Sequence, residues 1–184
     1  MATQPDEQAL ICDWNAEETP SQKPESAERS GESQNALYRF HASYTWEHIP
    51  VEEYKPGEGE WKSIIRQVIV GKKGESTAFE LRYFEIEPGG YSSLEKHLHE
   101  HVIIGIRGKG EVLAGHERYQ LAFLDTVYIS PDQPHQLLNP YSEPFGFFCI
   151  VNRDRDRPRV LSEEEREQLS SSPSSQLAPQ GRKG

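Results

Sequence analysis

The sequence predicts an all-β domain, a sandwich or a closed barrel, between residues 37 and 160. Short runs rich in β-branched and aromatic residues recur along this segment and are separated by Gly and Pro turns. No part of the segment shows sustained helical periodicity. Several short strands at such spacing are typical of sandwiches and barrels.

The first expected pair of strands is a hairpin. Residues 63–70 are rich in Ile and Val, and residues 77–87 alternate apolar and polar side chains. The glycines in 71–74 turn the chain between them. Pro88 and two following glycines then break the alternating pattern.

A second hairpin is expected further along the chain. The pattern resumes at 102–107, and the turn 108–110 leads into 111–114. Residues 125–130 and 145–151 are further strands, joined by a Pro-rich connection that holds His135. Alternation leaves several polar side chains as candidates for lining a barrel mouth: Arg66, Arg82, Tyr83, Tyr91, Tyr128 and Gln136.

Composition divides the chain into three parts. Residues 1–36 are rich in Glu, Gln, Ser and Pro, which predicts a disordered tail. Residues 37–160 form the β domain, and 161–184 are expected to be a short helix followed by a disordered tail. Ser162 and Glu165 have the spacing of a helix capping box.

Charge and cysteine content narrow the possible partners and compartment. The formal net charge of −10 argues against nucleic-acid and anionic-membrane partners, because both require a positive surface. Cys12 and Cys149 form no disulfide framework. The sequence shows neither a secretory signal nor a span long enough for a bilayer, so we expect a cytoplasmic protein.

A dense group of possible metal ligands follows Pro88. One carboxylate and three imidazoles, those of Glu95, His97, His99 and His101, lie within seven residues. Imidazole nitrogen and carboxylate oxygen together suit Fe, Mn, Ni, Cu or Zn. The strand pair that follows can bring His135 back beside this group.

The stretch resembles the first of the two sequence motifs of the cupin family. Gly89 and Gly108 match the glycines that flank that motif, and Glu95, His97 and His101 occupy its ligand positions. Glu95 stands where the family has its first His, and His101 stands where it usually has Glu. A register with His97 and the histidine two residues later as the adjacent pair would place an isoleucine at the third ligand position, which excludes that register.

Residues 124–139 resemble the second cupin motif, with matches at His135 and Asn139. Leu124, Ser130 and Asp132 replace its usual Gly, Pro and Gly. The resemblance implies a double-stranded β-helix, or jelly-roll β-barrel, with one divalent metal ion per chain. It assigns four metal ligands: Glu95, His97, His101 and His135. Fe or Mn is favoured as the metal, and Ni, Zn or Cu would also suit the ligands.

His99 shares the strand parity of His97 and His101. It is therefore either a ligand or a group behind the ligands, or a side chain that the local loop turns to solvent. His41, His48 and His116 have no ligand spacing and are expected at the surface or in satisfied positions.

The resemblance implies an enzyme acting on a small organic substrate. We expect an oxidoreductase of the dioxygenase type. An isomerase or lyase on the same scaffold, and a non-catalytic binding or sensing module, are the alternatives, because a fold this versatile does not name a reaction. Small cupins are commonly dimers, which implies a homodimer.

Overall fold

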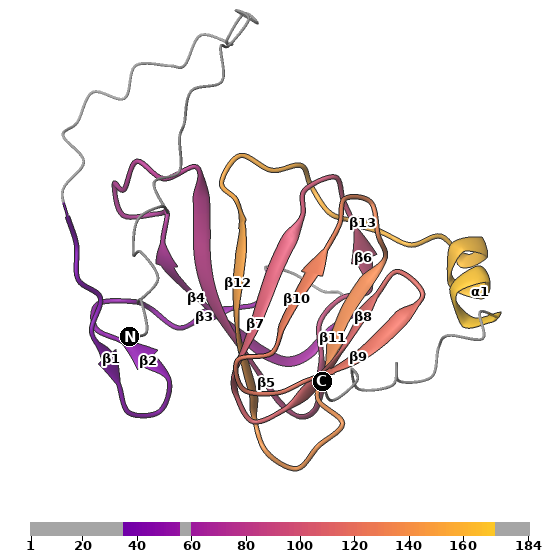
Figure 1. The fold of residues 1–184 in the computed structure, drawn as a ribbon, viewed down its shortest axis with the longest axis horizontal. Coiled ribbons are helices and arrows are strands. Elements are labelled where there is room, and N and C mark those ends of the chain that lie inside the picture. The colour runs from indigo at the N-terminus through magenta and orange to yellow at the C-terminus, as the bar shows by residue number, and fades with distance from the viewer. Residues whose placement is uncertain (1–34, 56–59, 172–184) are drawn as a thin grey trace, which may run out of the picture. The chain divides into compact units, whose positions relative to one another are not determined.

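The computed structural model describes residues 35–55 and 60–171, which form β-strands and one short helix (Figure 1). The two tails expected to be disordered, together with Cys12, fall almost wholly outside the described residues. Within the described part, no helix is long and apolar enough to cross a membrane.

One layer of the barrel has the antiparallel strand order β10-β7-β12-β5-β4-β3. Its longest pairing joins β12 to β5, from Phe145 opposite Ile86 to Asn152 opposite Phe79. The strands are β3 (Glu52–Glu53), β4 (Lys62–Val70), β5 (Phe79–Tyr91), β7 (His101–Arg107), β10 (Thr126–Ile129) and β12 (Phe145–Asn152).

The other layer has the order β9-β8-β11, and β11 also pairs with β6 and with the end of β5 at Tyr91. The short strand β13 pairs antiparallel with β6 at the edge of this layer. Because β5 pairs in both layers, the sheet is continuous and nearly closed (Figure 1). The strands are β6 (Glu95–Lys96), β8 (Gly110–Ala114), β9 (Glu117–Leu121), β11 (His135–Leu138) and β13 (Arg159–Val160).

The hydrophobic core lies between the two layers. Ile86 and Phe145 are fully buried from one layer, and Val112 is fully buried from the other. Alternate residues of β12 enter this core, including Phe147 and Cys149. The predicted all-β jelly-roll barrel is therefore confirmed.

The expected hairpin of β4 and β5 is present, but the second expected hairpin is wrong. Strands β7 and β8 do not pair with each other: β7 pairs with β10 and β12, whereas β8 pairs with β9 and β11. Gly108 has a φ of 59°, and a Cβ at Gly110 would lie 2.1 Å from the Phe145 ring. The turn therefore crosses over the core from one layer to the other, which the local pattern does not reveal.

Two other local expectations were also wrong. Strand β5 continues through Pro88 to Tyr91 instead of ending at the proline. His135 begins strand β11 and does not lie in a loop. In both cases pairing with a strand distant in sequence continues a strand that the local sequence marks as interrupted. The end of β5 pairs with β11, and His135 pairs with Ala114 of β8.

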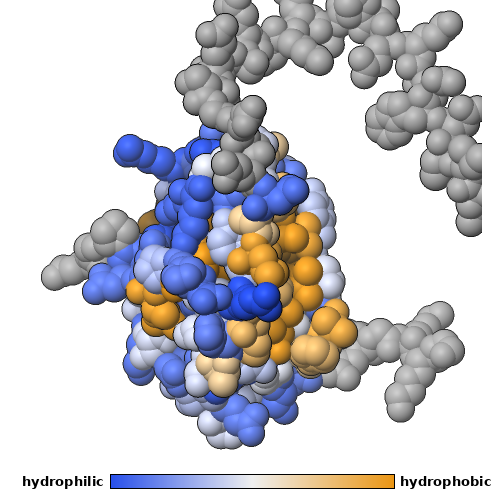
Figure 2. All heavy atoms as spheres, turned by 90° about the vertical axis from the view of Figure 1, so that its left-hand side faces the viewer, coloured by the Kyte–Doolittle hydropathy of each residue, from blue (hydrophilic) through white to orange (hydrophobic). Residues whose placement is uncertain are grey.

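A small two-stranded sheet packs outside the first layer. It contains β1 (Phe40–His41) and β2 (Thr45–Trp46), and the Trp46 ring lies 5.0 Å from that of Tyr83 and 5.7 Å from that of Phe148. Figure 2 views the side of the molecule that carries β1 to β4 and shows hydrophobic residues gathered beside hydrophilic ones.

The helix α1 (Glu163–Ser171) follows β13. The Glu165 N–H donates to Ser162 Oγ at 3.3 Å, and the Ser162 N–H donates to the Glu165 carboxylate at 2.9 Å. This is the reciprocal pattern of a capping box, as expected from the sequence.

Candidate metal centre

A cavity of about 210 Å³ lies within the barrel. This volume lies below the roughly 300–1,000 Å³ of drug-sized ligand sites, so it suits a smaller molecule. Apolar core residues line one part, among them Ile103, Phe147 and Leu137. The polar lining consists of Lys55, Arg66, Arg82, Ser92, Ser93, Glu95, His97, His99, His101, His135 and Arg155, with Tyr54 and Cys149.

Three buried histidines converge on this cavity from different parts of the chain. His97 follows β6, His101 begins β7 and His135 begins β11. One ring nitrogen from each lies within 4.8 Å of the others, and the Nε2 atoms of His97 and His101 are 2.9 Å apart. The three rings have centroid separations of 4.7, 4.7 and 4.9 Å. This geometry lets three imidazoles share one cation.

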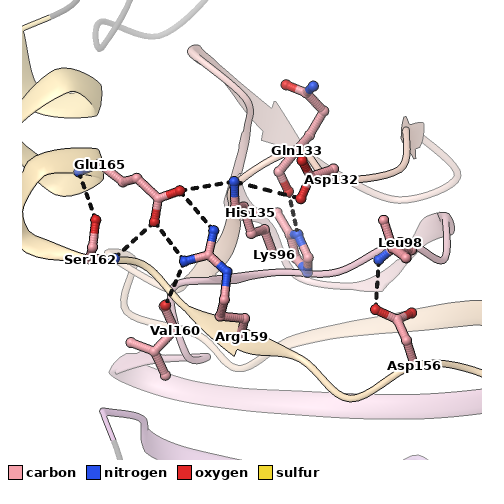
Figure 3. Close-up of polar contacts among 10 residues, drawn as sticks. All are labelled: Lys96, Leu98, Asp132, Gln133, His135, Asp156, Arg159, Val160, Ser162 and Glu165. Carbon is pink, nitrogen blue, oxygen red and sulfur yellow. Dashed lines mark hydrogen bonds and ion pairs between the residues drawn. The ribbon is translucent and has the colours of Figure 1, made fainter.

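Backbone carbonyls hold the other ring nitrogens. The Nδ1–H of His97 donates to the carbonyl of His99 at 2.8 Å. The Nδ1–H of His135 donates to the carbonyl of Gln133 at 2.9 Å, as Figure 3 shows. Because a carbonyl only accepts, the Nδ1 of each of these two rings must carry the proton, and their Nε2 atoms are unprotonated in the neutral ring. His101 Nδ1 contacts Cys149 Sγ at 3.1 Å.

Burial keeps these imidazoles neutral. Loss of water lowers the pKa of His97 to about 4, with the neighbouring imidazoles of His135 and His99 acting in the same direction. Burial also lowers the pKa values of His101 and His135. Neutral imidazoles with free Nε2 lone pairs are the form that binds a metal. The donor set therefore fits a divalent ion.

Glu95 lies beside these histidines, but its carboxylate contacts the ammonium group of a lysine. It pairs with His135 across β6 and β11, and it is buried. Its carboxylate forms an ion pair with the Lys55 ammonium, which also donates to Ser93 Oγ at 3.2 Å. Metal coordination by Glu95 thus stays a prediction. No local signal marks Lys55 as part of the site, because it lies forty residues away.

His99 is buried, so the alternative that the loop turns it to solvent is wrong. Its ring stacks on that of His97 at a centroid separation of 3.4 Å and an angle of 2°. Its Nδ1 lies 2.7 Å from Asp156 Oδ1, and His97, His99 and Asp156 form a second group with converging ligand atoms.

Asp156 fastens the segment after β12 to the histidine loop. Its carboxylate accepts the N–H groups of Leu98 at 2.8 Å and His99 at 3.1 Å, in addition to contacting the His99 ring. These hydrogen bonds hold the pKa of Asp156 well below its usual range, the Leu98 N–H contributing most. Sequence reasoning missed this residue, because it is separated from His99 by 57 positions.

Ion pairs attach α1 to the face of β6 that points away from the cavity, since Glu95 lines the cavity and Lys96 is the next residue of the strand. Lys96 Nζ lies 2.9 Å from Glu165 and 3.6 Å from Asp132, and Arg159 donates two hydrogen bonds of 2.8 Å to Glu165 (Figure 3). Leu169 of the helix also packs with Leu113 of β8 and with Leu161, which follows β13. The helix therefore contacts β13 and β6, and its contact residue on β6, Lys96, directly follows Glu95.

Of the other side chains proposed for the barrel mouth, Arg66 and Arg82 line the cavity. Tyr83, Tyr91, Tyr128 and Gln136 do not. Tyr83 instead faces the aromatic rings of the β1–β2 sheet. Alternation alone leaves the face of each strand ambiguous, and the pairing decides it.

Comparison with known proteins connects this geometry to a family. Residues 82–151 match the model of the cupin domain. The chain is 37% identical over 125 residues to the 1-methylthio-D-xylulose 5-phosphate methylsulfurylase of Rhodospirillum rubrum, which covers 67% of this chain and 79% of that protein.

Two crystal structures are similar to this fold. A cupin-2 domain protein of Rhodospirillum rubrum has a TM-score of 0.67 and 33% identity, over 74% of this chain and 90% of that one. A cupin 2 conserved barrel domain protein of Rhodopseudomonas palustris has a TM-score of 0.69 and 33% identity, over 74% of this chain and 94% of that one.

Proposed function

Because this chain belongs to the cupin superfamily, we propose that it is a metal-dependent enzyme acting on a small organic substrate inside the barrel. The observation that carries the proposal is the convergence of three buried imidazoles, from His97, His101 and His135, on one cavity. We propose Glu95 as a fourth ligand, since its strand pairs it with His135.

The donor set favours Fe or Mn, and Ni, Zn or Cu also accept imidazole and carboxylate ligands. Such an ion, when bound, acts as a Lewis acid on a substrate carbonyl or activates dioxygen. Three or four protein ligands leave positions free for a substrate on an ion that prefers six. A structural ion would need no such opening.

The chain's own residues prepare the site. The carbonyls of His99 and Gln133 fix the rings of His97 and His135 in the tautomer that presents Nε2 to the cavity. Phe147, Ile103 and other core residues form a wall that limits water. Lys55 lines the cavity, and its ammonium carries an exchangeable proton that can serve general acid–base chemistry when Glu95 binds the ion.

For the reaction, we propose chemistry on a methylthio ketose phosphate or a closely related compound. The support is the 37% identity to a protein named for such a substrate, over most of the barrel. The cavity also carries a free thiol, Cys149 Sγ, 3.1 Å from His101 Nδ1. A thiol in the substrate cavity is consistent with a reaction at a sulfur-containing substrate.

A dioxygenase-type oxidation is the second candidate. The observation in its favour is the imidazole-rich ligand group inside a partly apolar cavity, which would leave adjacent positions open for dioxygen and a chelating substrate. Isomerase and lyase chemistry would use the same opening through a polarised carbonyl.

The first test is the metal content of untagged protein purified without chelator, measured by inductively coupled plasma mass spectrometry. Near-stoichiometric metal is expected. The loaded protein is then incubated with 1-methylthio-D-xylulose 5-phosphate, with substrate loss followed by mass spectrometry and oxygen uptake by an electrode. Substrate loss without oxygen uptake supports the proposed chemistry on a methylthio ketose phosphate. Oxygen-dependent turnover of a small substrate supports the dioxygenase-type oxidation.

Two outcomes would contradict the proposal. A chain that takes up no divalent ion even after reconstitution would be better explained as a metal-free binding module. A chain that binds metal and small molecules without turning any of them over would be a sensor. The proposed homodimer is tested separately, by light scattering after size-exclusion chromatography.

A further inference from the structure

Arg82 is the one buried arginine among the residues that the structure describes. It lies on β5, with only 9% of its surface exposed, and it lines the cavity. Its Nη2 contacts Cys149 Sγ at 3.1 Å, and its guanidinium carbon lies 5.2 Å from the centre of the Phe84 ring. Its Nε has no hydrogen-bond partner in the described part of the chain.

The other cations that line the cavity are paired with carboxylates: Lys55 with Glu95, Arg66 with Glu52 and Arg155 with Glu80. Arg82 has no carboxylate within ion-pair distance among the described residues. Buried charges are normally paired, because an isolated one loses its hydration without compensation. The cavity thus holds one positive charge that the described chain does not balance, in addition to the charge of any bound metal.

We propose that Arg82 binds an oxyanion of the substrate, a phosphate or carboxylate group. A guanidinium presents N–H donors in a planar fork that matches two oxygens of such a group, and here the Nε–H donor is unused. The face of Phe84 restrains the plane of the fork. Arg82 is therefore a binding residue that selects anionic over neutral small molecules.

The proposal rests on the proposed function, since it names the class of substrate for the same cavity. Cys149 Sγ contacts both Arg82 and His101, so the anion site and the imidazole group are neighbours. One substrate can therefore reach both with its charged group on Arg82 and its reactive part toward the histidines. A phosphorylated ketose and a small carboxylic acid share this chemistry.

The test is calorimetric titration of the full-length chain with inorganic phosphate and, separately, with acetate at constant ionic strength. It is run on protein as purified and on protein treated with chelator, so that anion binding to a metal is separated from binding to Arg82. We expect saturable binding at one site in both preparations, and the tighter of the two anions identifies the charged group. An Arg82→Gln chain should bind that anion at least about tenfold more weakly.

Arg118→Gln is the matched control, because it removes an equal charge from an arginine that also has an unpartnered Nε but lies outside the cavity. Its affinity should stay within about threefold of the parent chain. The absence of saturable binding of either anion, or equal weakening by both substitutions, would overturn the proposal.

Removing a buried charge can prevent folding, which circular dichroism detects. Arg82→Lys then keeps the charge but loses the fork, and unchanged affinity in that folded variant counts against the proposal. Crystals of the parent chain soaked in phosphate need no variant: an anion bound away from Arg82 overturns it. Metal content is measured on the same samples. If the chain binds metal but no anion, only the Arg82 anion site is rejected. If it binds the anion but no metal, the Arg82 site is retained and the proposed metal-dependent enzyme is rejected.

Discussion

Two regions hold their polar side chains in different ways: the imidazoles that line the cavity, here called the floor, and the charged side chains outside it that hold α1 and the segment around Asp156, here called the rim. At the floor, neutral buried imidazoles such as His97 and His135 donate to backbone carbonyls. At the rim, charged side chains pair with one another, with Lys96 and Glu165 exposed by 17% and 28%. Backbone partners are fixed by strand register, whereas long charged side chains adapt.

This difference indicates what each region contributes. At the floor, hydrogen bonds to the backbone fix the positions of the ligands. The imidazoles there depend on burial for their neutral form. The rim attaches α1 and the segment around Asp156, where water weakens each ion pair. Substitutions at the floor should therefore abolish function, and substitutions at the rim should adjust it.

The largest effect is expected from His97→Ala or His135→Ala. Removing one of three converging ligands should lower metal affinity more than the 10- to 100-fold typical of outer residues of metal sites. Competition with a chelating dye measures the affinity. His116→Ala, at an exposed position, is the control and should bind as the parent chain does. Unchanged metal affinity in both floor variants would show that the ion binds elsewhere.

Glu95→Gln should lower metal affinity by at least about tenfold if the carboxylate leaves Lys55 to join the ion. The same dye competition measures this, together with the turnover of the loaded chain. Full metal affinity with a loss of turnover would instead make Glu95 a base acting with Lys55, and would remove it from the ligand set.

Asp156→Asn should have an intermediate effect, about tenfold in metal affinity. The carboxylate anchors the His99 ring, which stacks on His97, so the effect passes through the position of that ligand. Asp154→Asn, two residues earlier and exposed, removes the same charge and should leave affinity unchanged. Equal effects of the two substitutions would indicate only a long-range change of charge.

Acid should weaken the two regions of the metal-free chain in different pH ranges. The pKa of His97 is about 4, below the ordinary histidine value of 6.5, so the unfolded chain binds more protons and the free energy of unfolding falls as the pH drops from about 6.5 to 4. The lowered pKa values of Asp156 and Glu165 cause losses only below their ordinary values of 3.8 and 4.5. Urea unfolding from pH 6.5 to well below 3.8 should show both steps, and constant stability between pH 6.5 and 4 would contradict the first.

The smallest effect is expected from Lys96→Ala. Its pairs with Glu165 and Asp132 lie at the rim, so the melting temperature should fall by at most a few degrees, and less in high salt. Differential scanning calorimetry measures the shift, with exposed Lys72→Ala as the control. A large, salt-independent loss would show that docking of α1 is essential to the barrel.

Much of the site follows from the local sequence. His97, His99 and His101 alternate along an extended segment, which predicts that their side chains share a side, and all three are buried in the cavity. His135 was correctly predicted to join them. Its strand was missed, because the proline at position 134 marks a loop when the sequence is read alone.

The sequence by itself determined the all-β class, the capping box of α1 and the imidazoles of the site, because strand alternation, helix caps and motif spacing are local properties. Only the tertiary structure decided that β7 and β8 belong to different layers, that Lys55 pairs with Glu95, and that Arg82 lies buried with no ion pair to a carboxylate of the described residues. Those contacts join residues far apart in sequence, and they depend on strand register and chain crossing, which no single segment encodes.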